Sequence, residues 1–423
     1  MESYASFNDG KSIITLSEGL RSATENNRLI KIAFRNKEIS SADVLVAKSR
    51  LFPSINATLN QTYLSYQPGA RFDSLHVYTA EKESLSYGIN LYQTVYDFGS
   101  NISQYEASKT VLDVATLDIL RIKNIVALDF INTYFDLLET EKMISVLQME
   151  VESLESHLKV AQSLFAGGVI TKNDLLQAEV TLSDAKQRLL TMKNTRSINA
   201  SKINNILARP INMEVHVVDE PLDPHTQEGV ELEKAWEIAE KQRAEVKIID
   251  NELRIIDLEK IIKKSEYYPT VFAQGGYNYT ENRYLLHEDN WSLIFGVNLN
   301  IFSGGSTKAE VSKVGYRRNQ LLEQKKKLIE DIQLEVEKGY RDMNNALEKI
   351  KATKDATSQA EENLRINKIR YEEGIGTSTD VLDAITLLAK AETNYFSAVY
   401  ELNRARAGLL FATGSDLVSV YSH

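Results

Sequence analysis

The chain has 423 residues, with 6 prolines, 19 glycines and no cysteine, and its 49 basic and 59 acidic residues give a formal net charge of -10. The lack of cysteine excludes disulfides, cysteine nucleophiles and cysteine metal ligands, and the acidic balance argues against a nucleic-acid groove. So few prolines and glycines leave little room for linkers between several ordinary domains, and long secondary-structure elements are therefore expected.

Residues 1–20 do not form a secretion signal, because Asp9, Gly10 and Lys11 interrupt the apolar core that such a signal requires. Either a cytosolic protein or a mature chain with an added Met1 would have this sequence. No window approaches about 18 uninterrupted apolar residues, so no transmembrane helix is predicted. If the chain crosses a membrane, strands must do so.

A first helix is predicted over residues 16–50, with Thr15 and Glu18 forming a capping box at its start and Pro53 stopping it. A second helix of the same kind is predicted over residues 232–266. The two helices correspond at a constant offset, as in the pairs Leu16/Leu232, Ala23/Ala239, Ser49/Ser265 and Pro53/Pro269.

After each of these helices the hydrophobic period changes to two. Apolar and small polar residues alternate over 84–96 and 291–302, and 53–66 and 269–281 are weaker partners rich in Asn, Gln, Thr, Tyr and Gly. Each segment is about as long as a bilayer-spanning strand of about 9 to 11 residues. A soluble sandwich edge is the alternative, but tyrosines and Trp291 lie near strand ends and too few other strands are predicted. Because a closed channel needs at least about eight strands, membrane-spanning strands would require the chain to oligomerise.

Two helices without an internal proline are predicted over about residues 100–165 and 306–371, each about 100 Å long at about 1.5 Å per residue. From Leu147 to Phe165, apolar residues alternate spacings of four and three, and the return helices that follow show the same spacing. This pattern predicts a coiled-coil seam whose many small residues allow close packing.

The turns between the long helices and the return helices indicate a duplication. In the second turn Tyr371, Gly374, Thr377, Asp380 and Ala384 take the places that Phe165, Gly168, Thr171, Asp174 and Ala178 take in the first. The glycines suit helix C-caps and the residues after them suit N-caps, so each turn is predicted to close a tight helical hairpin. We expect two tandem repeats, residues 12–213 and 231–414, joined by an irregular connector at 214–230.

This duplicated order of strands, long helix, capped turn and return helix resembles the TolC family of outer-membrane channel proteins over almost the whole chain. The most specific motifs are Tyr371-x-x-Gly374, Asp380-Val-Leu-Asp383-Ala384, the copy ending in Asp174, and the corners Tyr96-Asp97-Phe98-Gly99 and Ile301-Phe302-Ser303-Gly304-Gly305. The resemblance implies a mainly α fold with transmembrane β-strands. Three chains would form a 12-stranded outer-membrane β-barrel, continued by a long periplasmic α-helical coiled-coil barrel.

The resemblance also implies a location in the outer membrane of a Gram-negative bacterium, in contact with its lipid. The function it implies is that of a passive exit channel of a tripartite efflux pump or a type I secretion system. A periplasmic adaptor protein and an inner-membrane RND or ABC transporter would be its partners. Drugs, metal ions and secreted polypeptides all remain open as substrates. The alternative is a non-transporting coiled-coil scaffold with soluble strands.

By the same resemblance, Asp380 and Asp383 match aspartates that ring the constricted periplasmic end of the tunnel. Six carboxylates around a three-fold axis would attract cations and repel anions. The alternative is that they are first-turn acids that interact with the helix dipole, an interpretation that applies best to Asp174. Tyr371 and Asp174 match positions that hold neighbouring hairpins together. Gly376 stands where some members have an arginine, so that salt bridge cannot form.

The turn glycines Gly167, Gly168 and Gly374 are expected to lie where the adaptor docks. No enzyme, metal site or cofactor is predicted, because the six histidines are scattered without ligand spacing and neither a nucleophile elbow nor a phosphate loop is present.

Overall fold

The structure is a computed structural model that describes residues 13–219 and 231–421. The described residues form two compact units: unit 1 combines residues 13–33, 119–219, 231–246 and 327–421, and unit 2 combines residues 34–118 and 247–326. The elements are β1 (Ile13–Ile14), α1 (Leu16–Asn26), α2 (Arg28–Ser49), β2 (Ser54–Tyr63), β3 (Gly69–Phe72), β4 (Leu75–Tyr78), β5 (Glu83–Tyr96), α3 (Ser100–Ala166), α4 (Lys172–Ile206), β6 (His216–Val217), α5 (Leu232–Gln242), α6 (Ala244–Ser265), β7 (Thr270–Thr280), β8 (Asp289–Asn298), α7 (Ser306–Glu372), α8 (Ser378–Ala412) and α9 (Leu417–Tyr421).

Corresponding helices in the two halves of the chain have equal lengths. α1 and α5 have 11 residues, α2 and α6 have 22, α3 and α7 have 67, and α4 and α8 have 35. Of the connector predicted at 214–230, the structure describes only 214–219, where β6 pairs in parallel with β1. Among the described residues, none of the helices is both long and apolar enough to cross a membrane.

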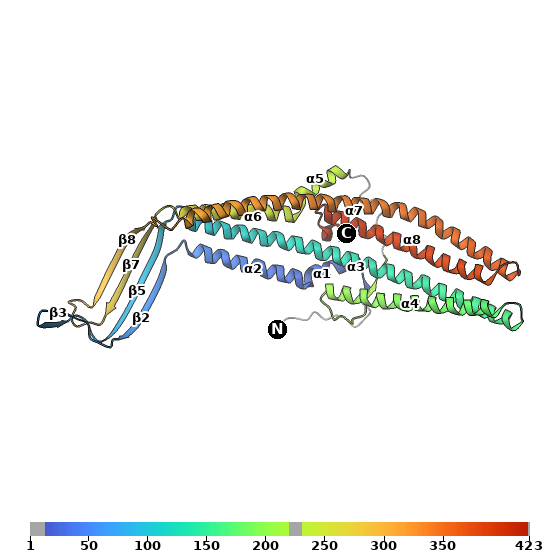
Figure 1. Cartoon of the computed structure of the whole chain (residues 1–423), viewed down its shortest axis with the longest axis horizontal. Helices are drawn as coiled ribbons and strands as arrows, with labels where there is room; N and C mark the ends of the chain where they lie inside the picture. The colour runs from blue at the N-terminus through green and yellow to red at the C-terminus, as the bar shows by residue number, and fades with distance from the viewer. Residues whose placement is uncertain (1–12, 220–230, 422–423) are drawn as a thin grey trace. The chain divides into compact units, whose positions relative to one another are not determined.

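Unit 2 contains an antiparallel four-stranded sheet in the order β2-β5-β7-β8 (Figure 1). Directly paired residues share a face, so Leu91 lies on the same face as Ile55, and Asn90 lies on the other face with Asn56. Continuing across the sheet, the register places Leu293 with Leu91, so one face is largely apolar and the other is polar. Within the chain, β2 and β8 each pair on one side only and form the two edges.

Two details of the strands differ from the prediction. The last strand, expected over 291–302, ends at Asn298, because Asn298 pairs with Thr270 at the start of β7 and no strand residue remains to pair beyond it. In addition, β3 and β4 form a separate small hairpin that was not predicted. Four residues per strand are too few for an alternating pattern to be recognised in the sequence.

The helices predicted over 16–50 and 232–266 are each broken into two. The breaks fall at Asn27 and Arg243, whose backbones are extended, with ψ of 136° and 127°. Asn27 Oδ1 accepts the amide of Leu29 at 2.8 Å, and its Nδ2 donates to the carbonyl of Ile206 at 2.8 Å. The first break is thus held by the end of α4. Neither break contains glycine or proline, which explains why the sequence predicted continuous helices.

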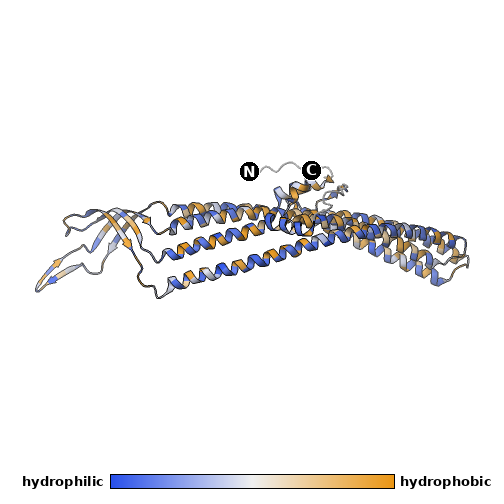
Figure 2. Ribbon diagram, turned by 90° about the horizontal axis from the view of Figure 1, so that it is seen from above, coloured by the Kyte–Doolittle hydropathy of each residue, from blue (hydrophilic) through white to orange (hydrophobic). Residues whose placement is uncertain are grey.

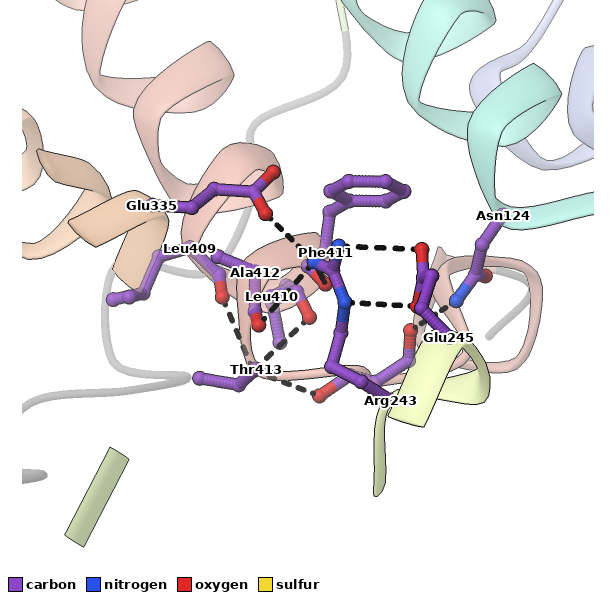
Figure 3. Close-up of polar contacts among 10 residues, drawn as sticks. Asn124, Arg243, Glu245, Glu335, Leu409, Leu410, Phe411, Ala412 and Thr413 are labelled. Atoms are coloured by element: carbon purple, nitrogen blue, oxygen red, sulfur yellow. Dashed lines mark hydrogen bonds and ion pairs between the residues drawn. The ribbon is translucent and has the colours of Figure 1, made fainter. Parts of the chain in front are cut away.

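The second break is held by a buried guanidinium (Figure 3). Arg243 is only 7% exposed, and its Nη1 donates to the carbonyls of Phe411 and Ala412 at 3.2 and 3.4 Å. It also pairs with Glu245 at 3.1 Å and Glu335 at 3.0 Å, and stacks over the Phe411 ring. Arg243 is therefore the counterpart of Asn27: each fixes a helix break to the last turn of a return helix.

Figure 1 shows α3 with α4 as one helical hairpin and α7 with α8 as another, and Figure 2 shows hydrophobic and hydrophilic residues interspersed along them. Near the turns the two hairpins share a buried apolar group, which we call the tip cluster: Val151, Leu154, Ala178, Leu182, Ala185, Leu364, Val381, Leu382, Ala384 and Ile385. All four helices contribute to it, so the two turns are joined within one chain by burial of apolar surface.

Candidate functional site

The two hairpin turns have matching backbone geometry. Gly168 and Gly374 both have φ of +74°, a left-handed conformation that favours glycine at a helix C-terminus. Their amides donate to the carbonyls of Phe165 and Tyr371 at 2.9 and 3.1 Å. Gly167 precedes the first of these and is exposed, as are Gly168 and Gly374.

Each return helix begins with a reciprocal capping box. The amides of Thr171 and Thr377 donate to Oδ2 of Asp174 and Asp380 at 3.0 Å, and the aspartate amides donate back to the threonine hydroxyls at 3.3 and 3.2 Å. The hydrogen bonds from Thr377 hold the pKa of Asp380 below its usual range. Both aspartates are therefore N-terminal caps, the alternative considered from the sequence. The exposed Asp380 carboxylate nevertheless remains ionised and carries a full negative charge.

Asp383 differs from Asp380 in having no structural partner. It is exposed on α8, and none of the described residues forms a hydrogen bond or ion pair with it. Residues three apart on a helix are neighbours on its surface, so Asp380 and Asp383 present two adjacent charges at the start of α8.

The lack of space at the end of α7 explains why glycine occupies position 376. Its amide donates to the carbonyl of Arg370 at 2.9 Å. A Cβ at this position would lie 3.1 Å from the carbonyl carbon of Arg370 and from the amide nitrogen of Tyr371. Any side chain here would therefore crowd the last turn of α7.

Tyr371 lies within the tip of its own chain. Its ring is 5.1 Å from that of His157, and its buried hydroxyl lies near the side chain of Ser378 but makes no well-formed hydrogen bond among the described residues. This burial raises the pKa of Tyr371. The structure does not place Tyr371 in a hydrogen bond with Asp174, whose carboxylate is engaged by Thr171.

Removing the unpartnered hydroxyl should not destabilise the fold. We expect Tyr371→Phe to leave the melting temperature unchanged or raise it, because an unsatisfied buried polar group costs about 1 to 3 kcal/mol. Tyr400→Phe is the matched control, since the Tyr400 hydroxyl donates to Asp219 at 3.0 Å and its removal should lower the melting temperature. Thermal unfolding of the two variants checks this, and a large loss of stability in Tyr371→Phe would contradict it.

A histidine that the sequence did not single out lies at the centre of this region. His157 Nε2 and Ser378 Oγ form a hydrogen bond of 2.8 Å between α3 and the first residue of α8. His157 follows Leu154, a member of the apolar seam, by three residues, and this spacing is the signal that could have indicated its burial. Both side chains are buried between the two hairpins. Nearby, Thr379 Oγ1 donates to Gln177 Oε1 at 3.2 Å and joins α8 to α4.

In the described part of the chain, no group of three or more histidines and acids is placed to hold a metal ion.

The family model for outer membrane efflux proteins matches residues 19–209 and 262–415. Nodulation protein T of Rhizobium leguminosarum bv. trifolii is 20% identical over 419 residues, covering 97% of this chain and 87% of that protein. Outer membrane protein TolC of Vibrio cholerae is 20% identical over 393 residues, covering 91% and 87%. The structure of the Campylobacter jejuni CmeC outer membrane channel superposes with a TM-score of 0.84 at 15% identity, covering 94% of this chain and 85% of CmeC.

The solved channels of this kind share the helix-rich fold described above, so the resemblance to TolC channels predicted from the sequence is confirmed. The family match spans most of the chain and includes both helical turns and all four strands of the sheet in unit 2. Residues 210–261, which contain the connector, α5 and most of α6, lie outside the match. The chain belongs to the outer membrane efflux protein family, a family of channels and not of enzymes.

Proposed function

We propose that the chain forms a trimeric exit channel in the outer membrane of a Gram-negative bacterium. The observation that carries this proposal is the open sheet of unit 2, whose edge strands β2 and β8 each lack a neighbour on one side within the chain. Unpaired strand edges are costly in a membrane, because their N–H and C=O groups find no water there. Three copies joined edge to edge give a 12-stranded barrel.

The two faces of the sheet suit different environments, one of lipid and the other of water. Large apolar residues that are exposed in the single chain, among them Leu59, Ile89, Leu293, Phe295 and Val297, share one face by register. Their exposure suits contact with lipid acyl chains. The other face carries Asn56, Asn90 and Ser292, which suit an aqueous lumen.

The long helices and their turns would then form the periplasmic part of the same channel. The helices of three chains would continue the lumen as a coiled-coil barrel built from two tandem repeats per chain. We place the narrow end at the hairpin turns, with Asp380 and Asp383 ringing the aperture and with Asp174, Tyr371 and Gly376 shaping the closed tip. Gly167, Gly168 and Gly374, exposed at the turns, would lie where a periplasmic adaptor docks. An inner-membrane RND or ABC transporter would supply the energy, and drugs, metal ions and polypeptides are all candidate substrates.

Assembly is tested first by mass. Protein extracted from the outer membrane in detergent should have three times the mass of the chain by light scattering, because the four strands of one chain do not close. A monomer that conducts ions in planar bilayers would refute the proposal. Quantitative recovery in the soluble fraction without detergent would instead support the alternative, a coiled-coil scaffold.

A further inference from the structure

His157 is enclosed by both helical hairpins of unit 1. Its side chain lies on α3 and is only 7% exposed. It bonds to Ser378, which is buried at the start of α8, and its ring packs against Tyr371 in the last turn of α7. A single imidazole thus contacts both helices of the opposite hairpin.

The charges around His157 do not favour a cation at this position. On α7, the ammonium of Lys368 acts on the imidazole as a like charge, and Tyr371 presents only a neutral phenol. On α8 and α4, the carboxylates of Asp380 and Asp174 accept hydrogen bonds from their own helix caps.

The acidic residues of α3 do not provide a counter-charge for a protonated His157 either. Glu155, two residues before His157, pairs with Lys186 of α4 at 2.7 Å, and Glu150, about two turns away, pairs with Arg188 at 2.9 Å. No carboxylate in the described residues forms an ion pair with His157 in this arrangement. An imidazolium at this position would therefore be buried beside a lysine without a counter-charge.

We propose that His157 is a proton-sensitive latch that holds the α3–α4 hairpin against the α7–α8 hairpin while it is neutral and loosens the tip when it is protonated. The Ser378 hydroxyl satisfies the neutral ring, and the side chain of His157 is largely shielded from water. A protonated ring would regain water only if the two hairpins separated. The consequence for conduction rests on the proposed channel function, whereas the latch itself is a property of one chain.

The direction of the pH dependence follows from burial. Burial, with a smaller contribution from Lys368, lowers the pKa of His157 below its ordinary value of about 6.5. A group whose pKa is depressed in the packed state stabilises that state only where it is neutral. The packed tip is therefore fully stable above about pH 6.5 and loses stability as the pH falls below that value.

Hydrogen exchange tests the latch directly on the detergent-solubilised full chain. Protection factors of amides 382–389, beyond the first turn of α8, are measured at about pH 8 and about pH 5 after correction for intrinsic exchange. In the parent protein we expect protection to fall on acidification, by at most about thirtyfold, because about 1.5 pH units separate the ordinary pKa of histidine from pH 5 and each unit contributes about tenfold. In His157→Gln, which keeps a hydrogen-bonding group, and in His157→Leu, which is apolar, protection should not change with pH.

The matched control is His216→Gln. His216 lies in unit 1, is paired with the exposed Glu214 at 2.8 Å and is remote in sequence from both turns, so this variant should keep the parent's pH dependence. Protection that is independent of pH in the parent, or a pH dependence that persists in both His157 variants, would overturn the proposal. Because exchange is read on the chain whether or not it conducts, loss of the latch is distinguishable from failure of the channel proposal. Planar-bilayer conductance at the same two pH values tests the channel proposal.

Discussion

Arg243→Ala is expected to destabilise unit 1 by about 1 to 3 kcal/mol, the cost of leaving buried hydrogen-bond acceptors without a donor, because the two carboxylates that lose their partner are partly exposed and can be hydrated. The substitution leaves the carbonyls of Phe411 and Ala412 without their side-chain donor. It also leaves Glu245 and Glu335 without their shared cation. We therefore expect a fall in melting temperature, measured by scanning calorimetry at one fixed scan rate because channels of this size often unfold irreversibly.

Three further variants separate the possible causes of this loss of stability. Arg243→Lys keeps the charge but cannot reproduce the planar fork of contacts, so it should lie between the parent and Arg243→Ala. Lys241→Ala removes a nearby cation whose pair with Glu237 is long, at 3.9 Å, and exposed, so it should change the melting temperature little. Equal effects of Arg243→Ala and Lys241→Ala would show that the buried contacts of Arg243 add nothing to stability. Asn27→Ala, at the corresponding break, removes fewer bonds and should have a smaller effect than Arg243→Ala.

The long helices and their turns could be predicted from the sequence because their signals are local. A seam that repeats every three or four residues, bounded by a cap at each end, fixes a helix to within about a residue or two. The helix predicted over 306–371 is observed as Ser306–Glu372. The capped turns followed from glycine and threonine at fixed positions, since φ of +74° at Gly168 and Gly374 requires a residue that tolerates left-handed backbone.

The helix breaks and the arrangement of the tip could not be predicted, because they depend on contacts between residues far apart in the chain. Asn27 bonds to Ile206, and Arg243 bonds to Phe411 and Ala412. Local propensity gives no sign of either break. Similarly, the burial of His157 depends on Ser378 from the other half of the chain. The family resemblance supplied the candidate aspartates, but only the structure distinguishes Asp380, which caps a helix, from Asp383, which does not.

This distinction leads to a prediction about ion selectivity, which rests on the proposed channel. In planar bilayers under a salt gradient, the parent's reversal potential should favour cations. The double variant Asp380→Asn with Asp383→Asn should lose most of that preference, because it removes two charges per chain from the aperture. Asp383→Asn alone should reduce the preference without disturbing the fold, since none of the described residues bonds to this carboxylate.

Asp174→Asn is the matched control for this experiment, because Asp174 occupies the same capping-box position in the other hairpin. If the aspartates of α8 act only as caps, Asp174→Asn and Asp380→Asn should have equal effects, and the ring would be contradicted.

The pH dependence of ion selectivity provides a second test of the aspartate ring. The pKa of Asp380 lies below its usual range, so its charge is retained as the pH falls and is lost only below about pH 4. Cation preference should therefore persist at about pH 5, where the His157 latch is expected to have loosened. Acidification to that value should raise the closed-state conductance while leaving its charge selectivity unchanged. A rise in conductance accompanied by a loss of cation preference would mean that one group controls both properties.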